Sequence, residues 1–343
     1  MRYIYDLSPE EIHEWTRQNS FPKYRGDQII NWVSKGISST GEMNNIPKSI
    51  RESLDRDFSF DDMVIIDIQR SKTDGTVKYV YQLKDGNIIE SVLMKYSYGH
   101  SVCVSSQAGC KMSCTFCAST GAGFGRNLSS GEMVFQVLSI SKDLGQRISH
   151  TVVMGIGEPL ENYDNLIKFI HQINNPDIHG IGMRKISVST CGLIAEMIKF
   201  IDEGLPITLC VSLHAPSDEI RKKIMPIARS NSMDELLKAC RLYVEKTRRR
   251  ITFEYILMKD VNDRVADARL LASKLKGIMC HINLIPANEY KGCNFKTSSS
   301  ENIKAFCDIL SGEGLNYTVR RQLGRDIDAA CGNLRRQKLL DND

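Results

Sequence analysis

The strongest constraint on the fold is an alternation that begins near residue 101. Short apolar runs alternate from there with amphipathic stretches of helical periodicity, among them 129–144, 233–247 and 263–276. The apolar runs are SVCVSSQ, HTVVMGIG, KISVSTCG, ITLCVSLH, ITFEYILM and HINLIPAN. Six strands joined by crossovers of helical length predict a parallel sheet. We expect an α/β fold, an incomplete (β/α)6 barrel, with a doubly wound open sheet as the alternative.

A different rhythm precedes these strands. Residues 1–57 predict helices, with Ser8 as an N-cap and Pro9 at the first helical position. Three alternating runs, 63–69, 76–83 and 87–94, are separated by Asp-Gly pairs, which favour hairpin turns. We therefore divide the chain into a helical accessory domain (1–57), a β-hairpin linker to the barrel (58–95), the barrel (96–330) and a C-terminal segment (331–343).

Small or polar residues follow the apolar part of each predicted strand. In β/α barrels the active site lies at the carboxyl ends of the strands. These ends would bring together Gly157, Glu158, Ser189, Ser212, His214 and Asn288.

Cys110, Cys114 and Cys117 lie on one short loop after the first barrel strand. Three thiolates so close together indicate a metal centre. A structural zinc ion needs a fourth ligand, and no Cys or His at suitable spacing lies just downstream. Three cysteines on a four-iron, four-sulfur cubane leave one iron open for a substrate. Zinc binding and chance spacing remain the alternatives.

Length and charge narrow the class of protein further. A chain of 343 residues, 42% of them hydrophobic, can bury a large core without disulfides. No apolar run reaches the roughly 18 residues of a membrane span, and the N-terminal sequence lacks the apolar stretch of a signal peptide. We therefore expect a cytoplasmic protein. The net charge of +4 is small, but basic residues form clusters, each of which also fits a solvated surface. These clusters are Lys222-Lys223, Arg248-Arg249-Arg250, Arg320-Arg321 and Arg335-Arg336.

Longer motifs give a more specific expectation. The cysteine loop and the later run MGIGEP resemble the radical S-adenosylmethionine (SAM) superfamily. Read together, CVSSQAGCKMSCTFCAS, VVMGIGEPL, ISVSTCGL, VSLHAP and DIDAACG resemble the dual-specificity RNA methyltransferases. That family methylates C2 of adenosine 2503 in 23S rRNA and C2 of an adenosine in certain tRNAs. The resemblance runs from about residue 20 to residue 335.

The resemblance implies the cofactors and their ligands. A 4Fe-4S cluster would be held by Cys110, Cys114 and Cys117, and two molecules of SAM would be used per turnover. The residues that match the family's SAM contacts are Gly157, Glu158, Ser189, Ser212, Leu213, His214 and Asn288.

The resemblance also implies three catalytic residues. Cys331 matches the cysteine that carries the methyl group, and Cys103 matches the cysteine that resolves the protein–RNA bond and then forms a disulfide with Cys331. In this route one SAM methylates Cys331, and a second is cleaved to a radical that activates the methyl group. Glu90 matches an acid proposed as the proton acceptor. A lone glutamate on a strand also fits a solvent-facing position.

The implied partners are 23S rRNA and tRNA, with a flavodoxin or ferredoxin as electron donor. We expect a monomer. Lys23, Arg25 and Lys35 of the helical module would contact RNA phosphates, and the target adenosine would leave its stack. Two alternatives remain: a sister family that methylates C8 of the same adenosine, and a non-catalytic ribosome-assembly protein with a structural cluster.

Overall fold

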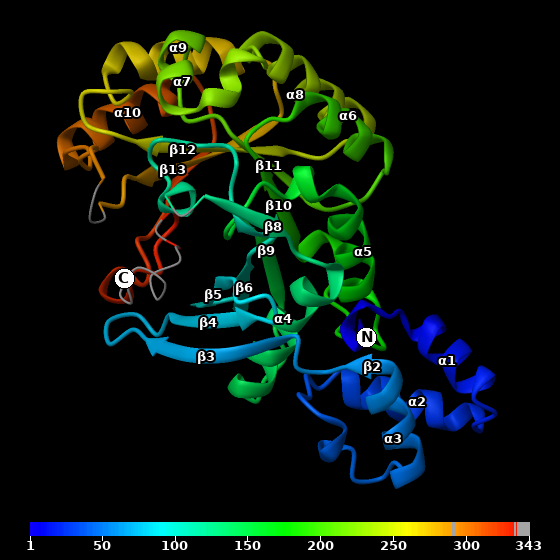
Figure 1. Cartoon of the computed structure of the whole chain (residues 1–343). Helices are drawn as coiled ribbons and strands as arrows, with labels where there is room; N and C mark the ends of the chain where they lie inside the picture. The colour runs from blue at the N-terminus through cyan, green and yellow to red at the C-terminus, as the bar shows by residue number, and fades with distance from the viewer. Residues whose placement is uncertain (122, 290–292, 333, 335–343) are drawn as a thin grey trace.

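The computed structural model describes residues 1–121, 123–289, 293–332 and 334. Its centre is a ten-stranded sheet with the strand order β14-β13-β12-β11-β10-β9-β6-β5-β4-β3 (Figure 1). Seven of these strands run parallel, and three antiparallel strands extend the sheet at one edge.

The parallel strands follow one another in space in the same order as in the sequence. They are β6 (Gly99–Val104), β9 (His150–Val153), β10 (Ile186–Thr190), β11 (Thr208–Ser212), β12 (Ile251–Leu257), β13 (Cys280–Pro286) and β14 (Tyr317–Val319). A doubly wound sheet would reverse this order at a switch point. The order never reverses, so the predicted incomplete barrel is confirmed and the open doubly wound alternative is wrong. The short strand β14 was not predicted.

Helices cover the outer face of the parallel strands as an arc (Figure 1). They are α4 (Ser130–Leu144), α5 (Tyr163–Asn174), α6 (Ile194–Asp202), α7 (Asp218–Ile224), α8 (Met233–Thr247), α9 (Val265–Leu275) and α10 (Ser300–Gly312). Ser129 and Ser232 begin α4 and α8 with capping boxes, in which a glutamate three residues on bonds back to the cap. The three helices predicted at 129–144, 233–247 and 263–276 are confirmed.

The antiparallel edge is a β-meander of β3 (Met63–Arg70), β4 (Val77–Leu83) and β5 (Ile88–Tyr96). The turns between them hold the predicted Asp-Gly pairs, with φ of 74° at Gly75 and 81° at Gly86. Strand β5 pairs with β6, so the meander and the barrel share one sheet. The division of the chain at residue 96 stays a prediction.

The N-terminal module holds α1 (Pro9–Gln18), α2 (Lys23–Val33) and α3 (Lys48–Asp57), with the short strands β1 (Arg2–Tyr3) and β2 (Phe58–Ser59) pairing beside them. Ser8 caps α1 and Pro9 is its first residue, as predicted. Tyr5 connects the module to the barrel, because its ring lies 4.9 Å from that of Phe135 on α4.

Two further strands and seven short 3-10 helices complete the described structure. The strands are β7 (Gln107–Gly109) and β8 (Phe124–Asn127). The short helices are Ile4–Asp6, Thr40–Glu42, Ala118–Thr120, Pro159–Asn162, Met183–Lys185, Pro226–Arg229 and Arg325–Ile327.

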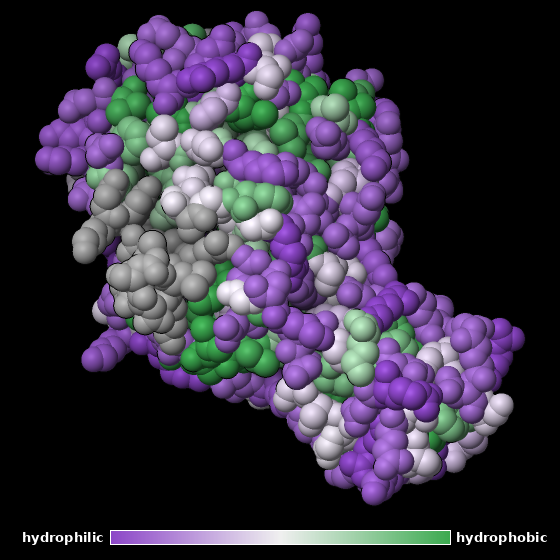
Figure 2. Space-filling model, viewed as in Figure 1, coloured by the Kyte–Doolittle hydropathy of each residue, from purple (hydrophilic) through white to green (hydrophobic). Residues whose placement is uncertain are grey.

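One large hydrophobic core joins the module, the meander and the barrel. A smaller second core surrounds the cysteine loop. On the face shown in Figure 2, hydrophobic residues run through the middle of the larger body, whereas the N-terminal module at lower right is mainly hydrophilic. Among the described residues no helix has the length and apolar character needed to cross a membrane.

Candidate active site

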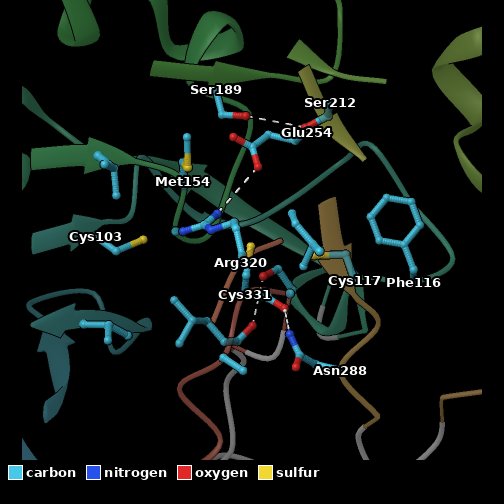
Figure 3. A pocket seen from close by; sticks show the side chains of 18 of the residues that line it. Cys103, Phe116, Cys117, Met154, Ser189, Ser212, Glu254, Asn288, Arg320 and Cys331 are labelled. Atoms are coloured by element: carbon cyan, nitrogen blue, oxygen red, sulfur yellow. Dashed lines mark hydrogen bonds and ion pairs between the residues drawn. The ribbon is translucent and has the colours of Figure 1, made fainter. Parts of the chain in front are cut away.

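A cavity of about 190 Å³ lies inside the barrel and reaches the carboxyl ends of its strands. The folding of the chain brings eleven of the thirteen predicted site residues to its walls. These are Cys103, Cys110, Cys114, Cys117, Gly157, Glu158, Ser189, Ser212, His214, Asn288 and Cys331. Several of them point into the same space in Figure 3.

The cysteine loop follows β7 and is fixed by backbone hydrogen bonds. The Thr115 N–H donates to the carbonyl of Ile224 on α7 at 2.9 Å, and the Cys117 N–H donates to the carbonyl of Cys114 at 3.1 Å. Burial raises the pKa of the Cys110 thiol to about 12 and that of Cys114 well above its ordinary value. Such thiols keep their protons at neutral pH unless a metal replaces them.

The loop suits an iron–sulfur cluster. In a cubane each thiolate binds a different iron atom, so three cysteines leave one of the four irons open. Met112, Phe116, Met225 and Ile285 form an apolar wall at this end of the cavity, which suits a cluster that must stay away from water.

Glu158 is held rigidly at the end of β9. One carboxylate oxygen accepts the N–H of Cys191 at 2.7 Å, and the other accepts the N–H of Leu160 at 3.1 Å. Burial raises the pKa of Glu158. Gly157 precedes it with φ of 111°, and a Cβ there would lie 2.6 Å from the side chain of Gln107. Only glycine allows this close passage of the backbone.

His214 presents a neutral imidazole to the cavity. Its Nδ1 accepts the N–H of Ile256 at 3.1 Å, which leaves the ring proton on Nε2. Burial and the nearby Arg221 lower the pKa of His214 to about 3. The ring also meets that of Phe116 edge to face, with centroids 4.8 Å apart. The imidazole can therefore donate to a ligand without carrying charge.

Cys103 and Cys331 reach the cavity from opposite parts of the chain (Figure 3). Cys103 lies within β6, opposite Val92 of β5 and Val152 of β9. Burial raises the pKa of Cys103 to about 12 and raises that of Cys331, while Arg320 lowers both. Cys331 is exposed as a residue, although many protein atoms surround its position.

Residues 324–332 and 334 carry Cys331 across the barrel. This stretch starts before the predicted boundary at 331 and is called the C-terminal segment from here on. At one end the Gly324 N–H donates to the carboxylate of Asp74 in the β3–β4 turn at 2.8 Å. At the other end the Ala118 N–H donates to the carbonyl of Gly332 at 2.8 Å, beside the cysteine loop. Between them Asn288 Nδ2 donates to the carbonyl of Cys331 at 3.1 Å. The segment thus holds Cys331 next to the cysteine loop.

Two predicted site residues do not line the cavity. Leu213 is fully buried in the main core, and its backbone N–H donates to the carbonyl of Glu254. Glu90 is 2% exposed and forms an ion pair with the equally buried Lys78 at 3.2 Å. The alternative of a solvent-facing Glu90 is therefore wrong. Glu90 lies on the same face of the sheet as Cys103, because it is two residues before Val92, the residue of β5 that pairs with Cys103.

Several charged residues of the site were not found in the sequence. Arg320 and Glu254 form an ion pair at 3.6 Å in the cavity wall. Arg221 is fully buried and donates to the carbonyl of Cys191 at 2.6 Å. In the sequence, Arg320 is distinguished only as part of a basic doublet that also fits a solvated surface. The structure instead places its side chain half-buried in the cavity wall. Arg335 and Arg336 lie outside the described residues.

Most of the other cysteines are small core residues. Cys210, Cys240, Cys280 and Cys307 are buried. Cys191 is buried too, but it also lines the cavity and holds Glu158 through its backbone.

The fold and the three-cysteine loop define a radical SAM enzyme. A family model described as the Radical SAM superfamily matches residues 104–271. A solved radical SAM methyltransferase from Sphaerobacter thermophilus is 37% identical and has a TM-score of 0.94, with 97% of this chain and 99% of that chain covered. The enzyme is a methyltransferase that uses SAM and a 4Fe-4S cluster.

Curated relatives narrow the class to one family. A probable dual-specificity RNA methyltransferase RlmN of Clostridium botulinum (strain Eklund 17B / Type B) is 49% identical over 336 residues, which are 98% of this chain and 97% of the relative. The one of Clostridium novyi (strain NT) is 47% identical over 343 residues, the full length of both. The chain belongs to the family of dual-specificity RNA methyltransferases.

Proposed function

We propose that this enzyme methylates C2 of adenosine 2503 in 23S rRNA and C2 of an adenosine in tRNA through a methyl group carried on Cys331. The observation that carries this proposal is the meeting of Cys103 and Cys331 in one cavity with the three-cysteine loop. A protein that used the cluster only for structure would have no need of two further thiols beside it.

Each residue then has a chemical task. Cys110, Cys114 and Cys117 would hold the cluster, which would supply one-electron cleavage of SAM. Glu158, Ser189, Ser212, Leu213, His214 and Asn288 would orient SAM, with Gly157 leaving room for it.

Cys331 accepts a methyl group by displacement at carbon and holds it toward the target base. C2 of adenine is electron-poor and its C–H bond is not acidic, so the carbon must be joined to it by a radical step. Cys103 removes the C2 proton and passes it to water, and the adduct radical gives one electron to the redox partner. The Cys103 thiolate then attacks the sulfur of Cys331. The bond from that sulfur to the bridging carbon breaks, the carbon keeps the electron pair and takes up a proton to become the methyl group, and the two sulfurs are left as a disulfide. Glu90 is a second candidate for a proton acceptor.

The RNA must reach this cavity as an unstacked adenosine, because a stacked base cannot enter the barrel. We propose residues 1–57 as the accessory module that binds RNA phosphates. Lys23 and Lys35 support this, since both are exposed. We further propose a monomer in the cytoplasm that receives electrons from a flavodoxin or ferredoxin.

Nucleoside mass spectrometry tests the proposal. The anaerobic, cluster-loaded enzyme is incubated with SAM, a reductant and RNA fragments that contain the target adenosine. We expect 2-methyladenosine, and its loss with the Cys331→Ala variant. Appearance of 8-methyladenosine instead would assign the enzyme to C8 methylation, and absence of any methylated adenosine would contradict both functions.

A further inference from the structure

The cavity holds two oppositely charged side chains beside the thiols, and neither has a part in the proposed route. Glu254 lies within β12 and is 3% exposed. Its Oε1 accepts Nδ2 of Asn283 at 2.9 Å, and its Oε2 lies 3.6 Å from Nη1 of Arg320. Among the described residues Oε2 has no hydrogen-bond partner. A buried carboxylate is costly unless it is paired, so this pair needs an explanation.

Arg320 lines the cavity near both thiols. It follows β14, and its backbone N–H donates to the carbonyl of Leu284 at 2.8 Å, which fixes the residue beside β13. In Figure 3 the guanidinium is drawn near the sulfurs of Cys103 and Cys331, with Glu254 above it. An arginine is always protonated, so both thiols have a fixed positive charge nearby.

The charges of the pair act on Cys331 in opposite directions. Burial raises the pKa of Cys331, Arg320 lowers it, and Glu254 raises it. Cys103 and Cys117 are the other thiols near Cys331, and Tyr96 and Arg321 also line the cavity. Among the described residues, Arg320 and Glu254 are the charged side chains that shift the pKa of Cys331.

We propose that the Glu254–Arg320 ion pair is a positioning device that prepares Cys331 to accept its methyl group. Arg320 stabilises the anionic sulfur, while Glu254 holds the guanidinium in place and limits its effect. This inference rests on the proposed function, because it assigns the pair to the methyl-accepting cysteine.

The chemistry of the first step explains the need for such a pair. The thiol first loses its proton to water. A bond then forms between Sγ of Cys331 and the methyl carbon of SAM, and the bond from that carbon to the sulfonium sulfur breaks. The sulfonium sulfur keeps the electron pair and leaves as a neutral thioether, so no oxidant or reductant is consumed. Only the thiolate is a good nucleophile, and burial alone would keep the thiol protonated.

Alkylation by iodoacetamide tests the proposal without SAM or RNA. The full-length, cluster-loaded protein is treated anaerobically at a series of pH values, and the peptide that contains Cys331 is quantified by mass spectrometry. For Arg320→Met we expect alkylation of Cys331 about tenfold slower at neutral pH, with the pH midpoint raised by about one unit. Arg320→Lys should restore most of the rate because it keeps the charge.

Glu254→Gln should act in the opposite direction and speed alkylation severalfold, because it removes the negative charge and keeps the shape. Arg325→Met is the matched control. Arg325 is an exposed arginine shortly after Arg320 in the chain, and it does not line the cavity. It should leave the rate unchanged. Iron content and the melting temperature show that each variant is folded.

An unchanged alkylation rate in Arg320→Met would overturn the inference. So would a change of the rate in the same direction in Arg320→Met and Glu254→Gln, because loss of either partner of a merely structural pair would affect the rate in the same way. Failure of the proposed function would give a different result: SAM would not methylate Cys331 in the unaltered protein, whatever the alkylation rates show.

Discussion

Cys103 and Cys331 differ in how the chain holds them, and this difference matches the different tasks proposed for them. Cys103 is fixed within β6 between two paired strands. Cys331 lies on a segment held by hydrogen bonds near its two ends. A carrier must move its methyl group between a donor and an acceptor, whereas a residue that only resolves the bridge can stay in place.

Removal of each cysteine should therefore stop the reaction at a different step. Cys331→Ala removes the carrier, so no bond to RNA forms. Cys103→Ala leaves methylation of Cys331 and addition to C2 possible, so a covalent protein–RNA adduct should accumulate. Denaturing gels with labelled RNA measure this as a shifted band in Cys103→Ala alone, and the double variant should lose the band. Full methylation by Cys103→Ala would show that the assigned role is wrong.

The Glu90–Lys78 pair allows a structural role to be separated from a catalytic one. Glu90→Ala leaves a buried ammonium group unpaired and should lower the free energy of unfolding by about 3–5 kcal/mol. The double variant Glu90→Leu/Lys78→Met removes both charges and should regain most of that stability. Denaturant unfolding measures this part.

Methylation by the same double variant then decides the role of Glu90. If Glu90 accepts a proton, activity should stay low although stability returns. Activity that returns together with stability would leave Glu90 a structural residue only.

The residues that sequence alone could identify are those with a local pattern. Cys110, Cys114 and Cys117 lie within one loop, so their spacing is visible in the sequence. Arg320 and Glu254 meet only because β14 and β12 are both neighbours of β13. No local pattern distinguishes Arg320 from a basic residue on the surface, and its half-buried place in the cavity wall follows from the tertiary fold.

At the level of elements, strand order determines where the site forms. Because the parallel strands succeed one another without reversal, their carboxyl ends all face one cavity. The long strands were predictable because buried parallel strands are nearly continuous apolar runs. β14 and the β7–β8 hairpin were not, since three or four residues of mixed character carry no periodicity.

The Asp74–Gly324 contact provides a test of the C-terminal segment. Asp74→Asn leaves one side-chain oxygen for the two backbone N–H groups of Thr76 and Gly324 and removes the charge, which weakens a hydrogen bond worth about 1.5–3 kcal/mol. We expect methylation of Cys331 by SAM to slow about tenfold, with iron content unchanged. Mass spectrometry of the Cys331 peptide measures the rate.

Asp85→Asn is the matched control, because Asp85 occupies the same place in the other Asp-Gly turn. Both aspartates accept the N–H two residues on at 3.0 Å. The contacts of Asp85 are with Asn87 and Arg126 and not with the C-terminal segment. Equal slowing in the two variants would mean that the segment does not depend on Asp74.

At the level of the whole molecule, the N-terminal module and the barrel share one core but present different surfaces. The module is mainly hydrophilic on the face shown in Figure 2. Its residues Lys23 and Lys35 are exposed. A substrate far larger than the cavity needs contacts of this kind, since the barrel can enclose only the target base. Phosphate contacts give affinity and position, and the cavity gives the chemistry.

Salt dependence of RNA binding tests this division. Lys23→Gln/Lys35→Gln removes two phosphate contacts, so the slope of log affinity against log salt should fall by about 1.4–1.8. Arg248→Gln/Arg250→Gln is the matched control with the same loss of charge, at exposed positions after α8. Arg249 is kept because its Nε donates to the carbonyl of Ile207 at 2.9 Å. The slope for the control variant Arg248→Gln/Arg250→Gln should stay unchanged. If the slope fell equally in both variants, the N-terminal module would have no special part in RNA binding.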